Sequence, residues 1–306
     1  KTLTQKLKDR FDDPYLKVVF KEVKKGRIEK TSTYKSKANA LSPCAKRRIS
    51  RSGNIERDTC LTKSGKARPD RDGVTTIERE EVGEGDDPYL NRSIKNFDGD
   101  DKPVADSYGV HKIRLKHDSR GCLTEKSFYD EDGEPTVNSD GVHEVQWKMN
   151  KACVVLTKEM YGPSGKVADG NGVFRYVNDV SNGLITKVSY FNTQGRRIEM
   201  PSLGAQAIAY QHDNKGNQLT VSYLGLDNQP KDIRSGYHQL RQTFNDRNML
   251  ETQSYFKSNG KPTTNKGSFE DVHKLFYVRD KYNNVLTKAF FNSRGKRTKD
   301  KLDRVF

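Results

Sequence analysis

The chain has 306 residues, of which 32% are hydrophobic and 32% are charged, and its formal net charge is +15. This composition is too lean for one deep core, and no apolar run is long enough to span a membrane. The positive charge predicts either a well-solvated surface or attraction to something anionic, such as nucleic acid, an acidic polysaccharide, a lipid surface or an acidic protein.

The first twenty residues differ from the rest of the chain. The string TLTQKLKDRF is compatible with a short helix, because Leu3, Leu7 and Phe11 fall on one side. We therefore expect residues 1–20 to form an N-terminal cap or short helix. The string DDPYL at 12–16 recurs at 86–90, where Asp-Asp-Pro favours a turn before a strand.

The opening segment is also notably basic. Lys24, Lys25, Arg27 and Lys30 surround one turn, and this is where we expect a contact with an anion. Because the chain starts at Lys1 and not at Met, we expect a processed mature form or an excised portion of a longer protein.

From Gly26 onward the sequence repeats one unit, represented by GCLTEKSFYDEDGEPTVNSDGVHEVQWKMN at 121–150. Each copy has a strand ending in a bulky pair, a turn, a loop, and a second strand that starts near GVH. The bulky pairs are Cys60-Leu61, Phe128-Tyr129, Met160-Tyr161, Tyr190-Phe191, Tyr223-Leu224, Tyr255-Phe256 and Phe290-Phe291. The turn residues that follow, about 32 residues apart from Asp101 on, are Ala38, Gly65, Asp101, Gly133, Gly165, Gly195, Asn228, Gly260 and Gly295.

The unit predicts a β-hairpin. Its strands are rich in β-branched and aromatic residues between Gly and Asn turns, and Gly65, Gly133, Gly165, Gly195, Gly260 and Gly295 suit a left-handed backbone. The two residues of a bulky pair point to opposite faces, so the strand end must be covered on both sides. At 112–116, Ile113 and Leu115 alternate with Lys and Arg, which predicts one apolar and one basic face.

We therefore predict an all-β fold, an elongated or spiralling antiparallel array of about nine β-hairpin repeats with a period of about 32 residues. First hairpin repeats cover 21–78, an irregular junction with the run GEGDD covers 79–102, regular hairpin repeats cover 103–297, and a tail covers 298–306. If the chain has a domain boundary, we expect it near 83–87. A β-propeller is the alternative, although the unit is short for a four-stranded blade.

Four of the six histidines occupy one column of the repeat: His111, His143, His238 and His273. Thr75, Phe174 and Gln206 stand there in other copies, which favours a semi-exposed strand position tolerant of mid-sized residues. A repeated ligand contact or a pH-sensitive face is the alternative. Adjacent hairpins place the column about 10 Å apart, too far for a shared metal ion.

The acidic turns 98–101 and 130–133 resemble fragments of calcium loops but lack the distal bidentate Glu, so turn formation explains them better. Cys44, Cys60, Cys122 and Cys153 have no metal-binding spacing. Apolar packing accounts for Cys60 and Cys122, and a disulfide between Cys44 and Cys60 is the alternative in adjacent strands. The sequence leaves the redox compartment open.

The strings KHDSRGCLTEKSFYDEDGEP and YQHDNKGNQLTVSYLGLDNQP resemble the tyrosine-aspartate hairpin repeats of the RHS and teneurin-like families, and also bacterial MORN-type repeats. The resemblance covers most of 26–297 but rests on turn and aromatic positions. The period is longer than in RHS repeats, and the Tyr-Asp pair stands only at Tyr129-Asp130. The resemblance implies a β-array that serves as a shell, spacer or adhesive surface.

No nucleophile, zinc, phosphate-loop or dinucleotide motif is present, so we predict no enzyme and no cofactor. The predicted function is a structural or adhesive one, in which an extended β-surface meets a protein partner, the cell envelope or a second copy. Two alternatives are a basic binder of an anionic polymer, nucleic acid or polysaccharide, and a shell segment of a larger secreted toxin-like protein. We expect a secreted, periplasmic or cell-surface location and no membrane-spanning segment.

Overall fold

The structure is a computed structural model that describes residues 2–5, 15–24, 27–34, 44–81, 91–266 and 272–298. Side chains are described from Cys44 onward, except at Glu81 and Asn91. Within these ranges the regular secondary structure consists of twenty-two β-strands. The described part of the chain contains no helix with the length and apolar character that a membrane span requires.

The chain folds into two compact units, one formed by Lys1–Gln146 with Tyr161–Gly165 and the other by Trp147–Met160 with Lys166–Phe306. The strands of the first unit are β1 (Thr2–Gln5), β2 (Tyr15–Lys24), β3 (Arg27–Tyr34), β4 (Lys46–Ser52), β5 (Ile55–Leu61), β6 (Thr76–Glu81), β7 (Asn91–Phe97), β8 (Lys112–His117) and β9 (Leu123–Tyr129). The strands of the second unit are β13 (Arg175–Ser181), β14 (Leu184–Phe191), β15 (Ala207–His212), β16 (Gln218–Leu224), β17 (Gln239–Phe244), β18 (Leu250–Phe256), β19 (Pro262–Thr263), β20 (Lys274–Arg279), β21 (Val285–Phe291) and β22 (Arg297–Thr298). Residues of both units occur in β10 (Glu144–Met149), β11 (Val155–Gly162) and β12 (Gly165–Lys166).

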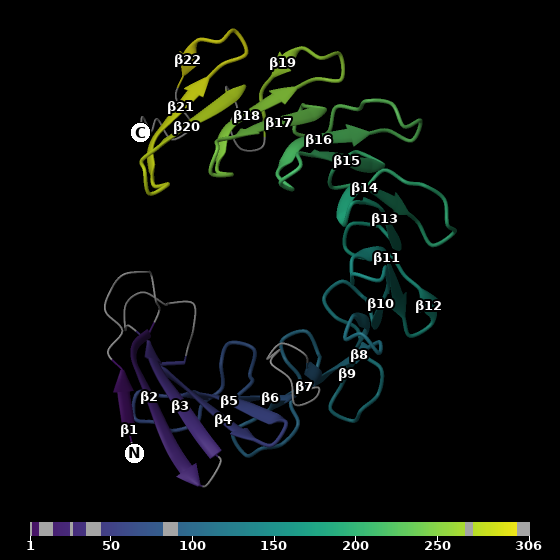
Figure 1. Ribbon diagram of the computed structural model, residues 1–306. Helices are drawn as coiled ribbons and strands as arrows, with labels where there is room; N and C mark the ends of the chain where they lie inside the picture. The colour runs from purple at the N-terminus through teal and green to yellow at the C-terminus, as the bar shows by residue number, and fades with distance from the viewer. Residues whose placement is uncertain are drawn as a thin grey trace. The chain divides into compact units, whose positions relative to one another are not determined.

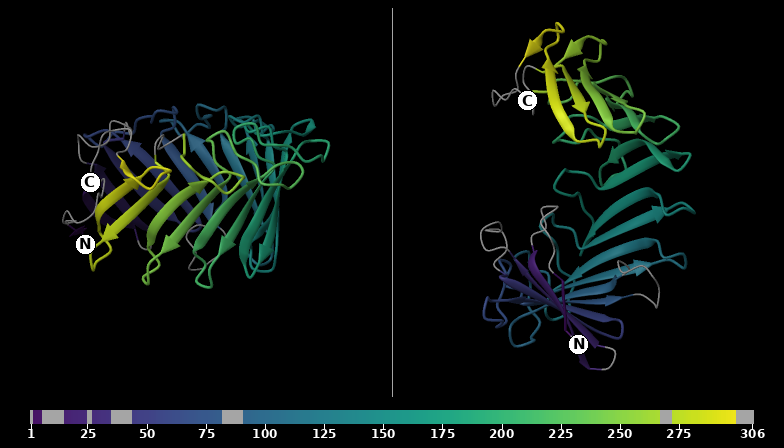
Figure 2. Two further views of the ribbon diagram at one scale, coloured as in Figure 1. Left: turned by 90° about the horizontal axis from the view of Figure 1, so that it is seen from above. Right: turned by 60° about the vertical axis from the view of Figure 1, so that its left-hand side comes forward.

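Strands that follow one another in the chain lie side by side and pair antiparallel within each unit (Figure 1). In the second unit the same order runs from β13 to β18, and β20 and β21 continue it, while the short β19 and β22 pair with the ends of β18 and β21. The two views of Figure 2 show this succession from other sides. The prediction of an all-β antiparallel array of hairpins is confirmed.

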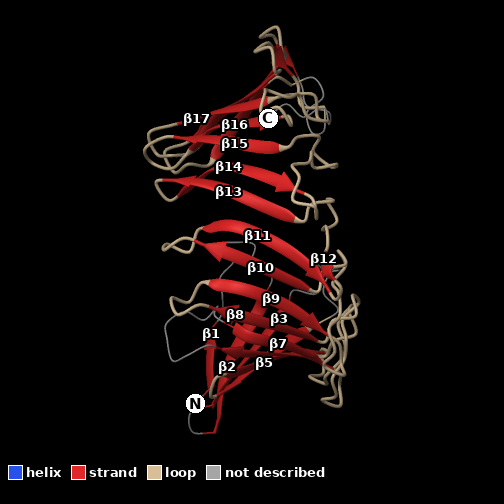
Figure 3. Cartoon of the chain, turned by 90° about the vertical axis from the view of Figure 1, so that its right-hand side faces the viewer, coloured by secondary structure: helices blue, strands red, loops and turns tan. Residues whose placement is uncertain are grey.

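The connections alternate between short turns and wide loops. Among the described connections, short turns lie at one end of a unit's strands and wide loops at the other, because consecutive strands are antiparallel (Figure 3). Short turns close hairpins such as β8–β9 and β15–β16, and wide loops join one hairpin to the next. Each sequence repeat is therefore one hairpin and one wide loop.

The predicted turn residues adopt the left-handed backbone that the sequence requires. Their φ values lie between 59° and 122° at Gly65, Asp101, Gly133, Gly165, Gly195, Asn228, Gly260 and Gly295. Ala38 lies outside the described residues. The prediction of left-handed turns at these positions is confirmed.

The substitution Gly133→Ala tests whether this turn position requires a residue that tolerates a left-handed backbone. The φ of Gly133 is 84° and nothing lies within 4 Å of the position that a Cβ would take, so Gly133→Ala changes only the backbone energy. We expect a loss of about 1–2 kcal/mol in the free energy of unfolding, measured by urea denaturation. Gly99→Ala is the matched control, because Gly99 lacks a left-handed φ and its Cβ would meet Thr75 Oγ1 at an ordinary 4.0 Å. Equal losses in the two variants would contradict the argument.

The two residues of each bulky pair divide between the faces of the sheet. The first member is buried, with exposed fractions of 1% at Met160, 2% at Tyr190 and Tyr255, and 5% at Phe128. In the second unit the first members Tyr223, Tyr255 and Phe290 pack into one core cluster, together with Ala205, Val221, Ile233, Val272 and Leu275. The second member is half-buried on the other face, as at Tyr129, Phe191 and Phe256. The prediction that the strand end is covered on both sides is confirmed.

The N-terminal segment corrects one expectation. Thr2–Gln5 is strand β1 and not part of a helix, and Leu3 pairs with Phe20 of β2. Pairing with the edge of β2 satisfies the backbone of this segment, and this tertiary interaction overrides its weak helical periodicity. Residues 6–14 lie outside the described residues, and Tyr15 and Leu16 of the first DDPYL string begin β2.

The expected irregular junction at 79–102 contains regular structure in its described part. Strands β6 and β7 pair over residues 76–81 and 91–97, within the first unit. The second DDPYL string and the expected boundary near 83–87 lie outside the described residues. In the expected tail, only Thr298, the end of β22, is described.

Cys44 and Cys60 form a disulfide, with their Cα atoms 5.1 Å apart and each residue 2% exposed. Cys122 and Cys153 are disulfide-bonded as well, and no cysteine is free. The disulfide hypothesis for Cys44 and Cys60 is confirmed, and the interpretation of Cys60 and Cys122 as packed thiols is wrong.

The Cys44–Cys60 disulfide closes a loop with a sequence separation of 16. A loop of this length restricts the unfolded chain enough to contribute about 3 kcal/mol. We expect the Cys44→Ser, Cys60→Ser double variant to unfold with a free energy lower by about that amount, as measured by urea denaturation under oxidising conditions. An unchanged midpoint would show that the disulfide does not stabilise the fold.

Candidate functional site

One five-residue turn recurs throughout the described chain. At Asp118, the side-chain Oδ1 accepts the backbone N–H groups of Arg120 at 2.9 Å and Cys122 at 3.1 Å. The backbone closes the same turn, since Gly121 N–H donates to the Asp118 carbonyl at 3.0 Å and Asp118 N–H donates to the Cys122 carbonyl at 2.9 Å. Gly121 adopts a φ of 82°. This is a turn with a glycine bulge, closed by an Asp or Asn side chain.

The same pair of side-chain bonds, between 2.8 and 3.2 Å, occurs at short turns and in wide loops, and it occurs twice in the wide loops that follow β7 and β9. The accepting residues besides Asp118 are Asp70, Asp98, Asp106, Asp130, Asn138, Asn150, Asp169, Asn192, Asp213, Asn245, Asp280 and Asn292. In each case the residue three positions later has a positive φ. The turn-forming interpretation of the acidic strings at 98–101 and 130–133 is confirmed.

Sequence reasoning missed these acceptors. It found the left-handed Gly and Asn positions but not the Asp or Asn three residues earlier, which is the signal that would have identified the whole turn. These acids and amides therefore have a structural role in the turns. Among the described residues, no group of three or more His, Cys, Asp or Glu side chains is arranged to hold a metal ion.

The turn carboxylates give the fold a pH dependence. Side-chain hydrogen bonds, from Arg120 to Asp118, from Asn217 to Asp213 and from Asn284 to Asp280, lower the pKa of each carboxyl below its ordinary 3.8. A lowered folded-state pKa contributes stability above the unfolded pKa, and this stability is lost as the pH falls through the folded-state value. Asn150 and Asn245 show that an amide oxygen makes the same turn.

We expect the Asp118→Asn, Asp213→Asn, Asp280→Asn variant to keep its fold and to lose less stability between about pH 5 and pH 3 than the parent protein. Thermal unfolding at each pH measures this. The control is Asp132→Asn, Asp140→Asn, Asp246→Asn, which removes the same charge from exposed carboxylates that accept no hydrogen bond among the described residues. Identical acid profiles for the two variants would contradict the assignment.

The histidine column lies where the strands meet the wide loops. His143 N–H donates to the Tyr161 carbonyl at 2.8 Å, and the His143 carbonyl accepts the Phe128 N–H at 3.0 Å. The corresponding pair of backbone bonds recurs at Thr75, His111, Phe174, Gln206, His238 and His273. Each column residue therefore joins the bulky pairs of two consecutive hairpins.

The imidazole rings serve the same structural purpose. The Nδ1 atoms of His143 and His273 lie 3.0 Å from the carbonyl oxygens of Thr136 and Thr263, so Nδ1 carries the proton and donates. His111 and His238 make similar bonds to Val104 and Tyr223. The rings of His111, His143 and His273 also pack edge-on against Phe97, Tyr129 and Phe256, with centroids 5.1 to 5.7 Å apart.

The expectation of a semi-exposed histidine column is therefore wrong for His111 and His238, which are 7% and 9% exposed. His143 and His273 are half-buried. The physical reason at His111 is the wide loop, which folds back over the strand end and presents the Val104 carbonyl to the ring, whereas the ring of His238 is held by the Tyr223 carbonyl of β16. A ligand-binding role for the column stays a prediction without support from its surroundings.

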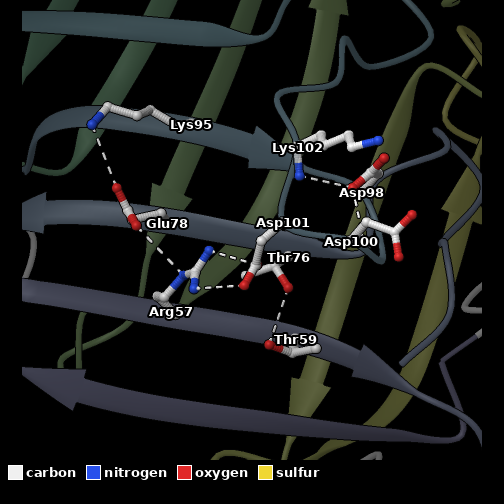
Figure 4. Close-up of polar contacts among 9 residues, drawn as sticks. All are labelled: Arg57, Thr59, Thr76, Glu78, Lys95, Asp98, Asp100, Asp101 and Lys102. Carbon is white, nitrogen blue, oxygen red and sulfur yellow. Dashed lines mark hydrogen bonds and ion pairs between the residues drawn. The ribbon is translucent and has the colours of Figure 1, made fainter. Parts of the chain in front are cut away.

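The face opposite the buried aromatics, which we call the polar face, carries the charged side chains. Across the first unit one row of directly opposed residues reads Ser50, Arg57, Glu78, Lys95, Lys112 and Tyr129. Glu78 lies between two cations, 3.4 Å from both Arg57 and Lys95, and Arg57 also donates to Asp101 at 2.8 Å (Figure 4). Beside this row, the hydroxyls of Thr59 and Thr76 are 3.2 Å apart. Over β5 to β7, cations and carboxylates thus neutralise one another.

The aromatic rings of the polar face are covered by cations. Arg57 lies over Phe97, Lys112 over Tyr129, Arg175 over Phe191 and Arg241 over Phe256, with 4.0 to 5.8 Å between the charge and the ring centroid. These contacts stabilise the half-buried rings. They also occupy the ring surfaces on which a nucleic-acid base would stack.

A groove of about 770 Å³ crosses the polar face over β6, β7 and β8, which we call the basic groove. Its described lining contains the cations Arg92, Lys95, Lys112, Arg114 and Lys116 and the carboxylates of only Glu80 and Asp118. His117 also lines it, and burial lowers the pKa of that imidazole, so its ring is neutral at pH 7. The predicted basic face of residues 112–116 is confirmed, and this groove is the candidate site.

The other basic cluster expected from the sequence is described in part. Lys24 and Arg27 pair at the end of the β2–β3 hairpin, and Lys30 lies opposite Phe20. Only the backbone of these three residues is described, and Lys25 lies outside the described residues. Their contact with an anion stays a prediction.

No protein-family model matches this sequence, and no curated protein matches it. The resemblance to RHS, teneurin-like and MORN-type repeats therefore stays a prediction.

Proposed function

We propose that this chain is a non-enzymatic binding scaffold, structural or adhesive in role, that presents the polar face of its hairpins to a macromolecular partner. The observation that supports this is that the residues holding the hairpins together and the residues exposed on the polar face are different sets. Most copies share the turn acids and amides, the left-handed turn residues and the buried first members of the bulky pairs. The backbone bonds of the column position also recur, although its side chain varies, and all these features hold the hairpins together.

The residues that differ between copies lie on the polar face. The position of Arg114 is occupied by Gln146, Val177, Ala209, Arg241 and Phe276 in the later copies. Three of these side chains, Arg114, Gln146 and Arg241, are exposed. A constant scaffold with a varied exposed face is typical of repeat proteins that bind a partner along their length.

A location outside the cytosol fits the covalent structure. All four cysteines are disulfide-bonded, and disulfides form and persist in oxidising compartments. We propose a secreted, periplasmic or cell-surface protein, whose partner is a cell-envelope component, another protein or a second copy of the chain.

Cosedimentation with cell envelopes of the producing organism tests the proposal. We expect saturable binding by the parent protein and at least tenfold weaker binding by the variant Lys187→Gln, Arg241→Gln, Lys274→Gln, which removes three cations from the polar face of the second unit. The control Lys151→Gln, Lys215→Gln, Lys261→Gln removes the same charge from exposed turns and should bind like the parent. Light scattering on a sizing column, at low and high salt, detects self-assembly. It therefore tests whether the partner is a second copy of the chain. Absence of both envelope binding and self-assembly would contradict the proposal.

A further inference from the structure

We propose that the basic groove over β6, β7 and β8 binds an acidic polysaccharide, a sugar chain that carries sulfate or carboxylate groups. This inference rests on the proposed function, because it names a partner class for one part of the polar face. It depends on four observations: cations without carboxylate partners, a like-charge pair, the spacing of the charges and the absence of an uncovered aromatic ring from the described lining.

The first observation is that three cations of the groove are not neutralised. In the described part of the chain, neither Arg92 nor Arg114 has an ion pair, and Lys112 contacts only the ring of Tyr129, at 5.8 Å. By contrast, Arg57 and Lys116 on the same face lie within 2.8 Å of a carboxylate. The two carboxylates of the described lining have other partners, since Glu80 accepts a hydrogen bond from Ser93 and Asp118 pairs with Arg120.

The second observation is a repulsive contact that the fold retains. Lys95 of β7 lies directly opposite Lys112 of β8 on the polar face. Residues so placed have Cβ atoms about 4.5–5.5 Å apart, and like charges there destabilise the sheet. Glu78 relieves this only partly, because it is shared between Lys95 and Arg57. An oxyanion bound between the two ammonium groups offsets their repulsion.

The third observation concerns size. Lys112, Arg114 and Lys116 alternate along β8, so their Cα atoms are about 6.8 Å apart in sequence order and the row spans about 14 Å. Lys95 adds a second row one strand away, about 4.8 Å distant. A single small anion cannot reach all these cations at once. A polymer with several sulfates or carboxylates can, and its affinity comes from releasing counterions at each cation.

The groove lacks what other polyanions need. Its described lining contains no Phe, Tyr or Trp, and the nearby Tyr129 ring is covered by Lys112, so bases have no stacking surface. The backbone of β7 and β8 is engaged in the sheet, so an acidic peptide cannot add as a strand on this face. The disulfides also favour an oxidising compartment, whereas nucleic acids are mainly inside cells. These points favour a sugar polymer recognised by its charges.

The test uses the full chain and heparin as a sulfate-rich probe, with affinity measured by titration calorimetry at several salt concentrations. We expect Arg92→Gln, Lys112→Gln, Arg114→Gln to weaken heparin binding at least tenfold and to reduce the salt slope by about one for each cation removed. The control Lys151→Gln, Lys215→Gln, Lys261→Gln removes three cations from exposed turns and should stay within about threefold of the parent. Circular dichroism confirms that each variant is folded, and Arg92→Lys, Lys112→Arg, Arg114→Lys should retain binding.

Three further anionic polymers, used as probes, test which class of polyanion the groove binds. Hyaluronan carries only carboxylates, so binding of both polymers supports general oxyanion recognition and binding of heparin alone narrows the class to sulfate. Single-stranded oligothymidine or poly-glutamate binding as tightly as heparin through the groove cations would overturn the inference. Equal losses in the groove variant and its control would overturn it too, because binding would then depend on net charge alone. In either case, envelope binding that survives in the parent would leave the proposed function standing.

Discussion

Each turn that carries the repeated hydrogen-bond pattern is closed by one side-chain oxygen, three residues before a left-handed residue, that accepts two backbone N–H groups. At Asp118 this interaction fixes the glycine bulge at Gly121 and hence which residues of β8 and β9 stand opposite each other. A one-residue slip of that register would move every buried ring to the polar face. Only 32% of the residues are hydrophobic, so the core is thin and the chain depends on local hydrogen bonds to hold its register.

The buried rings and the joining column follow from that register. Once the turns place Phe128 and Tyr129 at a strand end, the Phe128 ring enters the core and the Tyr129 ring lies half-exposed on the polar face. The Tyr129 ring must therefore be shielded from water by other side chains. The cover comes from His143, packed edge-on, and from the ammonium of Lys112. Aromatic and histidine side chains that looked available for binding are in this way engaged in the scaffold. The charged residues between them are left to define what the surface attracts.

The sequence was sufficient for the local features of the fold. Hairpins, left-handed turns and the two-sided strand ends were predictable because each depends on residues within one repeat, such as Gly133 and Phe128-Tyr129. Strand β1, the disulfide bonding of Cys122 and Cys153 and the role of the histidines were not, because each depends on interactions that sequence spacing does not reveal. The alternation of basic and apolar residues at 112–116 could be predicted from the sequence, but the groove could not. Its cations become a site only when β7 places Lys95 opposite Lys112 and Glu78 is shared with Arg57.

An alanine scan of one repeat, 121–150, together with the groove cations, tests the division between scaffold and surface most directly. Each variant is measured twice, for its free energy of unfolding and for its binding to cell envelopes when folded. We predict two separate sets: turn, ring and column residues such as Asn138, Phe128 and His143 lower stability by about 1–4 kcal/mol and leave binding intact, whereas polar-face cations such as Arg114 weaken binding at nearly constant stability. Scaffold residues that abolish binding without loss of stability would contradict the account.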